Sequence, residues 1–378
     1  APMAKSPDSD HLPEPDRAEG APHPRETRLL LGQDRAEAAF LDAYASGRLH
    51  HGWLLTGPKG VGKATLAWRI ARFLLATPED QGGFFAPAPP GSLDIPEDDP
   101  VARRIRALSE PRLFLLRRGP NDKGDALTRE ITVGEVRKMK SFFALSAADG
   151  GRRVAIIDAA DELNTAAANA LLKLLEEPPE GVTMLLVSHQ PARLLPTIRS
   201  RCRVLALHPL TPADMASALS AAGAEVHDPQ AMAQLSGGSV GAAMRIEGLD
   251  GLALYARLVE LFATLPRLDR PRAAQLAETT AGKGAEGRFD LLLELIDLFL
   301  ARAARAGATG QLPPEAAPGE AALIARLSPD PQAARLWADL AQTLGLRARR
   351  GRAVNLDPAA LVLDMLLRID AAARGARP

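Results

Sequence analysis

The chain has 378 residues, 46% of them hydrophobic, which is enough to bury the cores of two or three domains. Its 46 basic and 46 acidic residues balance, so any contact with nucleic acid needs a local basic patch. The single cysteine, Cys202, excludes a disulfide within the chain and a cysteine-based zinc site. No apolar stretch is long enough to cross a bilayer, and none resembles a signal peptide, so we expect a cytoplasmic protein without membrane contact.

The chain begins with a segment of low complexity. Residues 1–26 are rich in proline, histidine and scattered charges and lack periodicity, which predicts a disordered arm. A globular pattern starts at Leu29. Residues 76–110 interrupt it with a segment rich in proline, glycine and aspartate, and we expect this segment to be an excursion on the surface.

Strands and helices then alternate as far as residue 208, which predicts a parallel sheet with a nucleotide at the carboxyl ends of its strands. The expected strands are Trp53–Leu55, 113–116, 153–158, 183–188 and 204–207, and the expected helices are 65–75, 133–143 and 165–176. After His208 only helical periodicity remains. The expected helices there are 211–222, 228–235, one ending at Arg245, 252–265, 288–306, 321–344 and 357–373.

A glycine-rich loop follows the first apolar strand and precedes a helix. This order is the one that holds nucleotide phosphates, because glycines let backbone N–H groups surround the phosphates and a lysine reaches the terminal ones. We therefore expect this segment to bind nucleotide, with ATP as the candidate ligand. Its residues are Gly57, Pro58, Lys59, Gly60, Val61, Gly62, Lys63, Ala64 and Thr65.

Two positions needed for hydrolysis lack their functional groups. The residue after the loop lysine should offer a hydroxyl to magnesium, but it is Ala64, and Thr65 is rotated by about 100° on a helix. Asp158 ends an apolar strand where a P-loop ATPase keeps its magnesium-organising acid, yet Ala159 replaces the glutamate that orients water. We therefore expect slow or absent hydrolysis and predict no metal ligands.

Several segments together resemble the clamp-loader subunits of bacterial DNA polymerase III, which are members of the AAA+ ATPase superfamily. The resemblance runs from about Leu29 to Arg245, and its most specific pair is Leu-Leu-Glu-Glu-Pro-Pro, ending at Pro179, with Ser200-Arg201-Cys202. Further matches are Leu31-Gly32-Gln33, His51-Gly52-Trp53, the phosphate-binding loop, Asp158 and, near the C-terminus, Val354-Asn-Leu-Asp-Pro358.

The resemblance implies a fold in three parts. An α/β P-loop AAA+ domain with a parallel sheet would occupy residues 27–208, and a small helical lid would occupy 209–247. An all-α collar domain, which mediates oligomerisation, would occupy 248–378.

Within that family, three departures favour the delta-prime subunit over the gamma/tau motor. The motor has a cysteine-rich zinc module after the P-loop helix, whereas residues 76–110 hold no cysteine, so we expect no zinc. The position of the catalytic glutamate is Ala159. The lid segment Gly238-Ser239-Val240-Gly241 lacks the arginine with which the motor senses nucleotide. His189 also departs from the family's first sensor motif.

The resemblance also implies roles and partners. Arg201 matches the family's arginine finger, which acts on ATP bound by the neighbouring subunit, and a planar cation suits a terminal phosphate. The chain would be a largely non-hydrolysing stator in a hetero-pentamer with delta and gamma/tau subunits, which loads the sliding clamp on primed DNA during replication. Arg137, Lys138 and Lys140 lie on one expected helix and would either contact DNA phosphate or form a solvated face.

Two other functions stay open. An active gamma/tau-like ATPase would need Thr65 to serve magnesium and Asp161 or Glu162 to replace the missing glutamate, although we expect both acids to begin the next helix as favourable N-terminal charges. A P-loop small-molecule kinase would explain the loop, but neither Ser200-Arg201-Cys202 nor the all-helical C-terminal third. Turnover by the isolated chain tests the first alternative, and co-purification with polymerase subunits tests the second.

Overall fold

The computed structural model describes residues 14–17, 22–27, 29–77, 90–121, 126–145, 151–224, 227–282 and 284–375. These residues form two compact units. The first holds the described residues up to Ala222 together with Ser239–Gly241, and the second holds the remainder. The predicted division at 208/209 and 247/248 stays a prediction.

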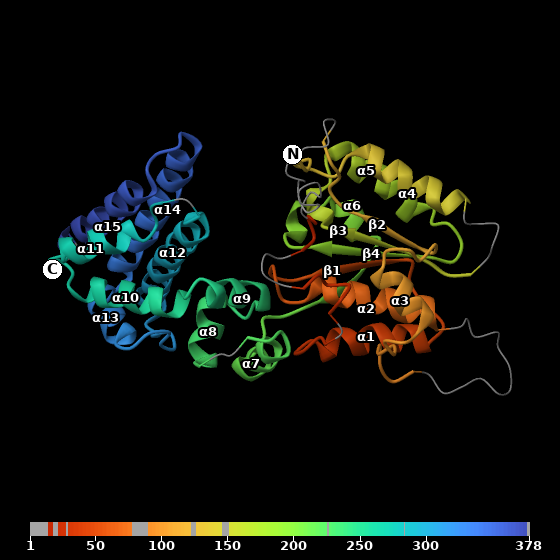
Figure 1. The fold of residues 1–378 in the computed structure, drawn as a ribbon, viewed down its shortest axis with the longest axis horizontal. Helices are drawn as coiled ribbons and strands as arrows, with labels where there is room; N and C mark the ends of the chain where they lie inside the picture. Colours follow the sequence, from red (N-terminus) through yellow and green to blue (C-terminus); the bar gives the residue numbers. More distant parts are fainter. Residues whose placement is uncertain are drawn as a thin grey trace, which may run out of the picture. The chain divides into compact units, whose positions relative to one another are not determined.

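The first unit is built on a parallel sheet, as the alternating pattern predicts (Figure 1). Its five strands lie in the order β2-β3-β4-β1-β5. Because every strand runs the same way, all five carboxyl ends lie at one edge of the sheet. The strands are β1 (Gly52–Thr56), β2 (Leu113–Leu116), β3 (Arg153–Asp158), β4 (Val182–Ser188) and β5 (Arg203–Ala206).

Helices cover both faces of this sheet, which explains why its central strands are continuously apolar. Trp53 and Leu55 pack with one set of helices, whereas Leu54 between them packs with the other set. The first set is α1 (Asp34–Ala45), α2 (Lys63–Ala76) and α3 (Pro100–Arg106), and the second is α4 (Val133–Leu145), α5 (Thr165–Glu176) and α6 (Pro196–Arg199). The unit also contains the short 3-10 helices η2 (Ala160–Glu162) and η3 (Pro191–Arg193) and the helix α7 (Pro212–Ala221).

The start of the chain corrects the expectation of a disordered arm over residues 1–26. His23 is fully buried; its ring meets Trp68 of α2 edge-on at 5.7 Å, and its Nε2 lies 3.1 Å from Oδ2 of Asp16. Hydrophobic periodicity gave no signal for this segment, because a buried polar pair, and not a stripe of apolar side chains, holds it in place. The rest of residues 1–26 lies outside the described residues.

The expected surface excursion over residues 76–110 is only partly right where the structure describes it, because residues 91–100 are mostly exposed but Leu93 and helix α3 are packed. Leu93 is 1% exposed and belongs to the core beneath α2. Asp99 caps α3 by accepting hydrogen bonds from the backbone nitrogens of the helix's first turn, and Pro100 occupies its first position. Helix α3 then packs on α2 through the buried Ile105. Residues 78–89 lie outside the described residues.

The second unit is entirely helical in the residues that the structure describes. Its two long helices, α12 and α14, pack along each other. Among the described helices of the whole chain, none is long and apolar enough to span a bilayer. The helices are α8 (Pro229–Ser236), α9 (Val240–Gly248), whose first two residues belong to the first unit, α10 (Gly251–Ala263), α11 (Arg270–Glu278), α12 (Glu286–Thr309), α13 (Glu320–Leu327), α14 (Pro331–Ala353) and α15 (Pro358–Gly375).

The single helix predicted over residues 321–344 is wrong, because the chain breaks it at Ser328-Pro329-Asp330. Asp330 starts a new helix by accepting hydrogen bonds from Gln332 N and Ala333 N at 2.8 Å each. A capping aspartate followed by proline at the first helical position is a start signal that the sequence contains.

Candidate functional site

The phosphate-binding loop joins β1 to α2 at the carboxyl edge of the sheet. Gly57, Gly60 and Gly62 have φ of +142°, +81° and +99°, in the range that favours glycine. Close neighbours reinforce the requirement: a Cβ on Gly57 would collide with the backbone oxygen of Leu207, and one on Gly62 would come within 2.5 Å of Leu30. The loop therefore has the curled backbone that the sequence predicts.

Two contacts from distant parts of the chain hold this loop. Gln33 is 3% exposed; its Nε2 donates to Val61 O at 3.2 Å and to His208 O at 2.7 Å, while His208 N donates to its Oε1 at 3.1 Å. From the other side, Val240 N donates to Gly60 O at 3.1 Å. The matched Leu31-Gly32-Gln33 segment thus links the loop to the backbone of His208 through the side chain of Gln33.

Lys63 lies at the centre of the site. It is 3% exposed, and its Nζ donates to Gly57 O at 2.7 Å and to Pro58 O at 2.5 Å. Burial lowers the pKa of Lys63 to about 8, while Asp158 and Asp161 act to raise it. Two backbone carbonyls therefore hold the ammonium inside the curl of the loop.

Asp158 ends β3 and is 7% exposed. Burial raises its pKa to about 7, and the carboxylates of Asp16 and Glu162 push it in the same direction, while Lys63 opposes them. This acid is therefore only partly ionised at neutral pH.

The next acids along the chain have partners of their own. Oδ1 of Asp161 accepts from the backbone nitrogen of His189 at 2.9 Å, and Glu162 pairs with Arg118 at 2.9 Å. Both acids belong to η2 and do not begin α5, which Asn164 caps by accepting from Ala167 N, so the expectation of N-terminal charges is wrong.

The nucleotide site therefore fits phosphate better than it fits metal. The positive-φ glycines and the buried Lys63 suit an anion, whereas Ala64 and the buried Ala159 offer no oxygen ligand. Burial, reinforced by Lys63, lowers the pKa of His189 to about 4, so its imidazole is neutral. Within the described ranges, no group of three or more His, Cys, Asp or Glu side chains could hold a metal ion.

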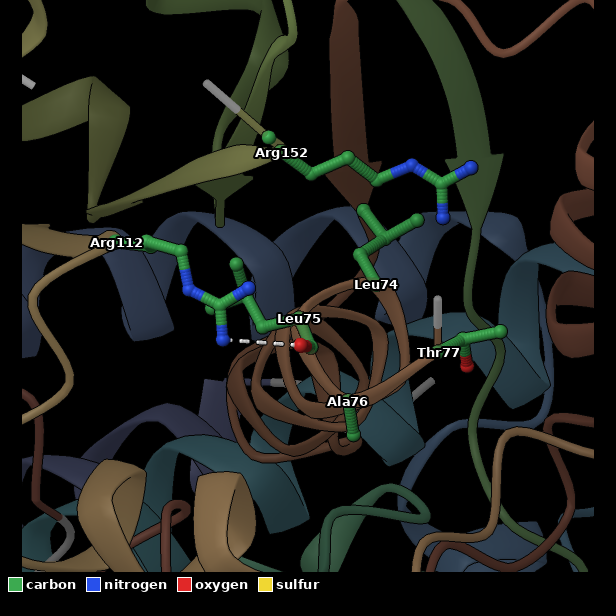
Figure 2. Close-up of a pocket in the computed structure, with 7 residues that line it drawn as sticks. Leu74, Leu75, Ala76, Thr77, Arg112 and Arg152 are labelled. Atoms are coloured by element: carbon green, nitrogen blue, oxygen red, sulfur yellow. Dashed lines mark hydrogen bonds between the residues drawn. The ribbon is translucent and has the colours of Figure 1, made fainter. Parts of the chain in front are cut away.

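A surface pocket of about 380 Å³ lies elsewhere (Figure 2). Its lining includes the last turn of α2, where Arg112 donates to Leu75 O at 3.1 Å, and Arg152 (Figure 2). Helix α2 has 14 residues, so this end lies about 20 Å from the loop at the other end. The pocket is therefore not part of the nucleotide site.

Arg201 lies where three of the matched sequence segments meet. A Cβ on Gly52 would come within 2.9 Å of Leu175 Cδ2 and 3.3 Å of both Arg201 O and Cys202 Sγ. His51, beside Gly52, places Nε2 3.0 Å from Leu175 O. The start of β1, the end of α5 and the turn after α6 thus form one packed cluster, which the sequence showed only as separate motifs.

The guanidinium of Arg201 is partly exposed, at 37%. Its Nη1 donates to Thr197 O at 3.1 Å and its Nη2 lies 2.9 Å from Oε1 of Glu176. The arginine is therefore accessible from outside the chain and held at both terminal nitrogens. Sequence reasoning matched Glu176 as part of a motif but missed this pairing.

The three basic residues proposed for DNA contact are exposed on α4. Arg137 and Lys140 flank the buried Met139, and Lys138 pairs with Glu135 at 2.7 Å. Exposure suits either a DNA contact or a solvated helix face, so the assignment stays a prediction.

Known proteins resemble this chain in sequence. A family model described as DNA polymerase III, delta subunit, matches residues 32–211. The DNA polymerase III subunit delta' of Escherichia coli strain K12 is 30% identical over 335 residues, which cover 87% of this chain and 91% of that protein. The chain belongs to the delta-prime family.

Other relatives match over shorter stretches. The delta' subunit of Pseudomonas aeruginosa is 37% identical over 214 residues, or 56% of this chain and 60% of that protein. The gamma/tau subunit of Mycobacterium tuberculosis strain H37Rv is 30% identical over 200 residues, or 50% of this chain and 30% of that protein. The match thus spans less than two thirds of the length of both relatives.

Among solved structures, a DNA polymerase III gamma subunit-related protein from Thermotoga maritima aligns with 89% of this chain and all of its own, at 14% identity and a TM-score of 0.39. The fold assignment of this delta-prime family member rests on its own parallel sheet and P-loop.

Proposed function

We propose that this chain is the delta-prime subunit of a DNA polymerase III clamp loader and acts as a stator with little or no ATP hydrolysis of its own. Its partners would be delta and gamma/tau subunits in a cytoplasmic hetero-pentamer that places the sliding clamp on primed DNA. Membership of the delta-prime family supports this assignment, and the local geometry of two sites supports the division of labour.

The nucleotide site supports a binding role without hydrolysis. Its loop and buried Lys63 suit phosphate, but Asp158 is buried beside two carboxylates, and the position after it carries no side-chain oxygen. The active-ATPase alternative has no observation in its favour, because Asp161 and Glu162 already contact other groups. The kinase alternative is set aside, because the chain belongs to another family.

Arg201 is the observation that carries the proposal for action in trans. A partly exposed guanidinium with donors to spare, held at the surface of a P-loop unit, can reach a phosphate bound by a neighbouring chain. Such an arginine stabilises charge that develops on the transferred phosphoryl group. It contributes to the neighbour's turnover and not to binding by its own loop.

Replacing Arg201 tests this role. In a loader reconstituted from this chain and the delta and gamma/tau subunits of its own cell, Arg201→Ala should lower DNA-dependent ATP hydrolysis and clamp loading. An arginine finger contributes on the order of 10³-fold or more at its own site, but the other sites of the ring remain active, so the total loss should be partial. Steady-state phosphate release measures it.

The control is Arg199→Ala, which removes an exposed arginine two residues away on α6. Both variants should assemble normally on gel filtration. If Arg201→Ala assembles and hydrolyses ATP as fast as the wild type and the control, Arg201 is an ordinary surface residue.

A further inference from the structure

The carboxylate that faces Arg201 stands at an unfavourable place for helix stability. Glu176 is the last residue of α5 and Glu177 is its C-cap. The carboxyl end of a helix carries partial negative charge, so cations stabilise it and carboxylates do not. The two consecutive acids therefore do not stabilise α5. Of the two, Glu176 is the one that pairs with Arg201.

The geometry leaves the arginine both oriented and free to bind. A guanidinium has five N–H donors in one plane. Nη1 donates to Thr197 O at 3.1 Å, and Nη2 forms an ion pair with Glu176 Oε1 at 2.9 Å. The other N–H donors are available to an incoming anion. A free arginine side chain samples many rotamers. The two contacts already restrict those rotamers, so the side chain loses less conformational entropy when a phosphate binds.

The contact is also weak enough to adjust. Glu176 is 41% exposed and Arg201 is 37% exposed, so water screens the pair. A terminal phosphate carries more charge than a carboxylate and can draw the guanidinium forward without a large penalty. The backbone beneath it is closely packed, because Gly52 lies directly against Arg201 O and Cys202 Sγ.

We propose that Glu176 is a positioning residue for Arg201, presenting the guanidinium toward phosphate bound by a neighbouring subunit. This rests on the proposed function of Arg201 in trans. The proposal gives the positioning role to Glu176, the first glutamate of Leu-Leu-Glu-Glu-Pro-Pro, and not to Glu177.

The test uses the reconstituted loader with five versions of this chain: Glu176→Gln, Glu176→Asp, Glu177→Gln, Arg201→Ala, and Glu176→Gln combined with Arg201→Ala. Glutamine keeps the size of Glu176 and removes its charge, and Glu177→Gln is the matched control on the next residue. Glu176→Gln should lower kcat for ATP by about two-fold, never beyond the loss from Arg201→Ala, with KM unchanged. It should add nothing when Arg201 is already alanine, and Glu176→Asp should recover part of the loss.

The outcomes separate this inference from the function on which it rests. If Arg201→Ala lowers kcat and Glu176→Gln does not, the positioning role is wrong and the trans-acting arginine stands. A rise in kcat with Glu176→Gln, or a further loss in the Arg201→Ala background, also overturns the positioning role. If Arg201→Ala itself has no effect in an assembled loader, both are wrong.

Discussion

Asp158 and Lys63 show how burial sets the chemistry of single residues in this protein. Both are less than one tenth exposed, and burial penalises the charged form of each. Desolvation raises the pKa of Asp158 to about 7 and lowers the pKa of Lys63 to about 8, so neither side chain is fully ionised at neutral pH. Bound phosphate would favour the ammonium and disfavour the carboxylate.

The shift at Asp158 predicts a pH-dependent stability. Its folded pKa of about 7 lies above the ordinary 3.8, so between these values the native state holds a proton that the unfolded state has released. The resulting stability is complete below 3.8 and is lost as the pH rises through 7. Asp158→Asn stays neutral, so relative to wild type it should gain on the order of 2 kcal/mol between pH 5 and pH 8. Urea unfolding at both pH values measures it.

The control for this variant is Asp98→Asn, which changes an exposed carboxylate. It should show no pH-dependent gain. A variant Asp158→Asn that loses stability at pH 8 would mean that attraction between Asp158 and Lys63 outweighs the desolvation of the acid.

Helices of the second unit are joined by a buried polar group instead of by apolar packing alone. Glu320 at the start of α13 is fully buried; it accepts from Tyr255 of α10 at 2.6 Å and from Arg302 of α12 at 2.7 Å. The backbone nitrogen of Ala316 donates to its other oxygen at 2.7 Å, and Gln234 of α8 accepts from the arginine at 3.3 Å. One carboxylate thus fixes the register of three helices and, through Arg302, contacts a fourth.

Breaking this pair should destabilise the second unit strongly. Glu320→Ala leaves the guanidinium of Arg302 buried without its carboxylate, which typically costs about 3–5 kcal/mol. The double variant Arg302→Met with Glu320→Leu removes both charges and should recover part of that loss, because Tyr255 and the Ala316 nitrogen still lose their acceptor. Glu260→Ala, which removes an exposed acid on α10, is the control. Denaturant unfolding followed by circular dichroism measures all three, and a single variant as stable as the control would contradict the prediction.

At the scale of the whole molecule, the proposed function divides catalysis and structure between different chains. Under this proposal Ala159 offers no carboxylate to orient water in this chain, while the partly exposed Arg201 would serve a partner. The expectation that the chain holds no zinc stays a prediction, which elemental analysis can check.

The isolated chain should therefore show negligible ATPase activity with or without primed DNA. Magnesium has no hydroxyl ligand at Ala64 and no glutamate at Ala159 to orient water. Lys63→Ala should weaken nucleotide binding and leave the background turnover unchanged, as measured by equilibrium binding and phosphate release. Robust hydrolysis that disappears with Lys63→Ala would overturn the stator assignment.

The local features of the fold can be read from the sequence alone. Strands β1 to β5, the phosphate-binding loop and most helices follow from periodicity, glycine placement and caps, which act over a few residues. The break before α14 was equally local, and the Asp330-Pro331 signal would have found it. The absent hydroxyl at Ala64 and the absent glutamate at Ala159 are likewise visible in the sequence alone.

The contacts between distant segments, in contrast, become visible only in the folded chain. Gln33 bridges to His208, and Gly52, Leu175 and Arg201 pack together, because the parallel sheet places segments far apart in the chain side by side. The burial of His23 beside Asp16 had no local signal either, since a polar pair becomes stable only in a site that other elements enclose. Pairing and burial depend on neighbours that no short window of sequence contains.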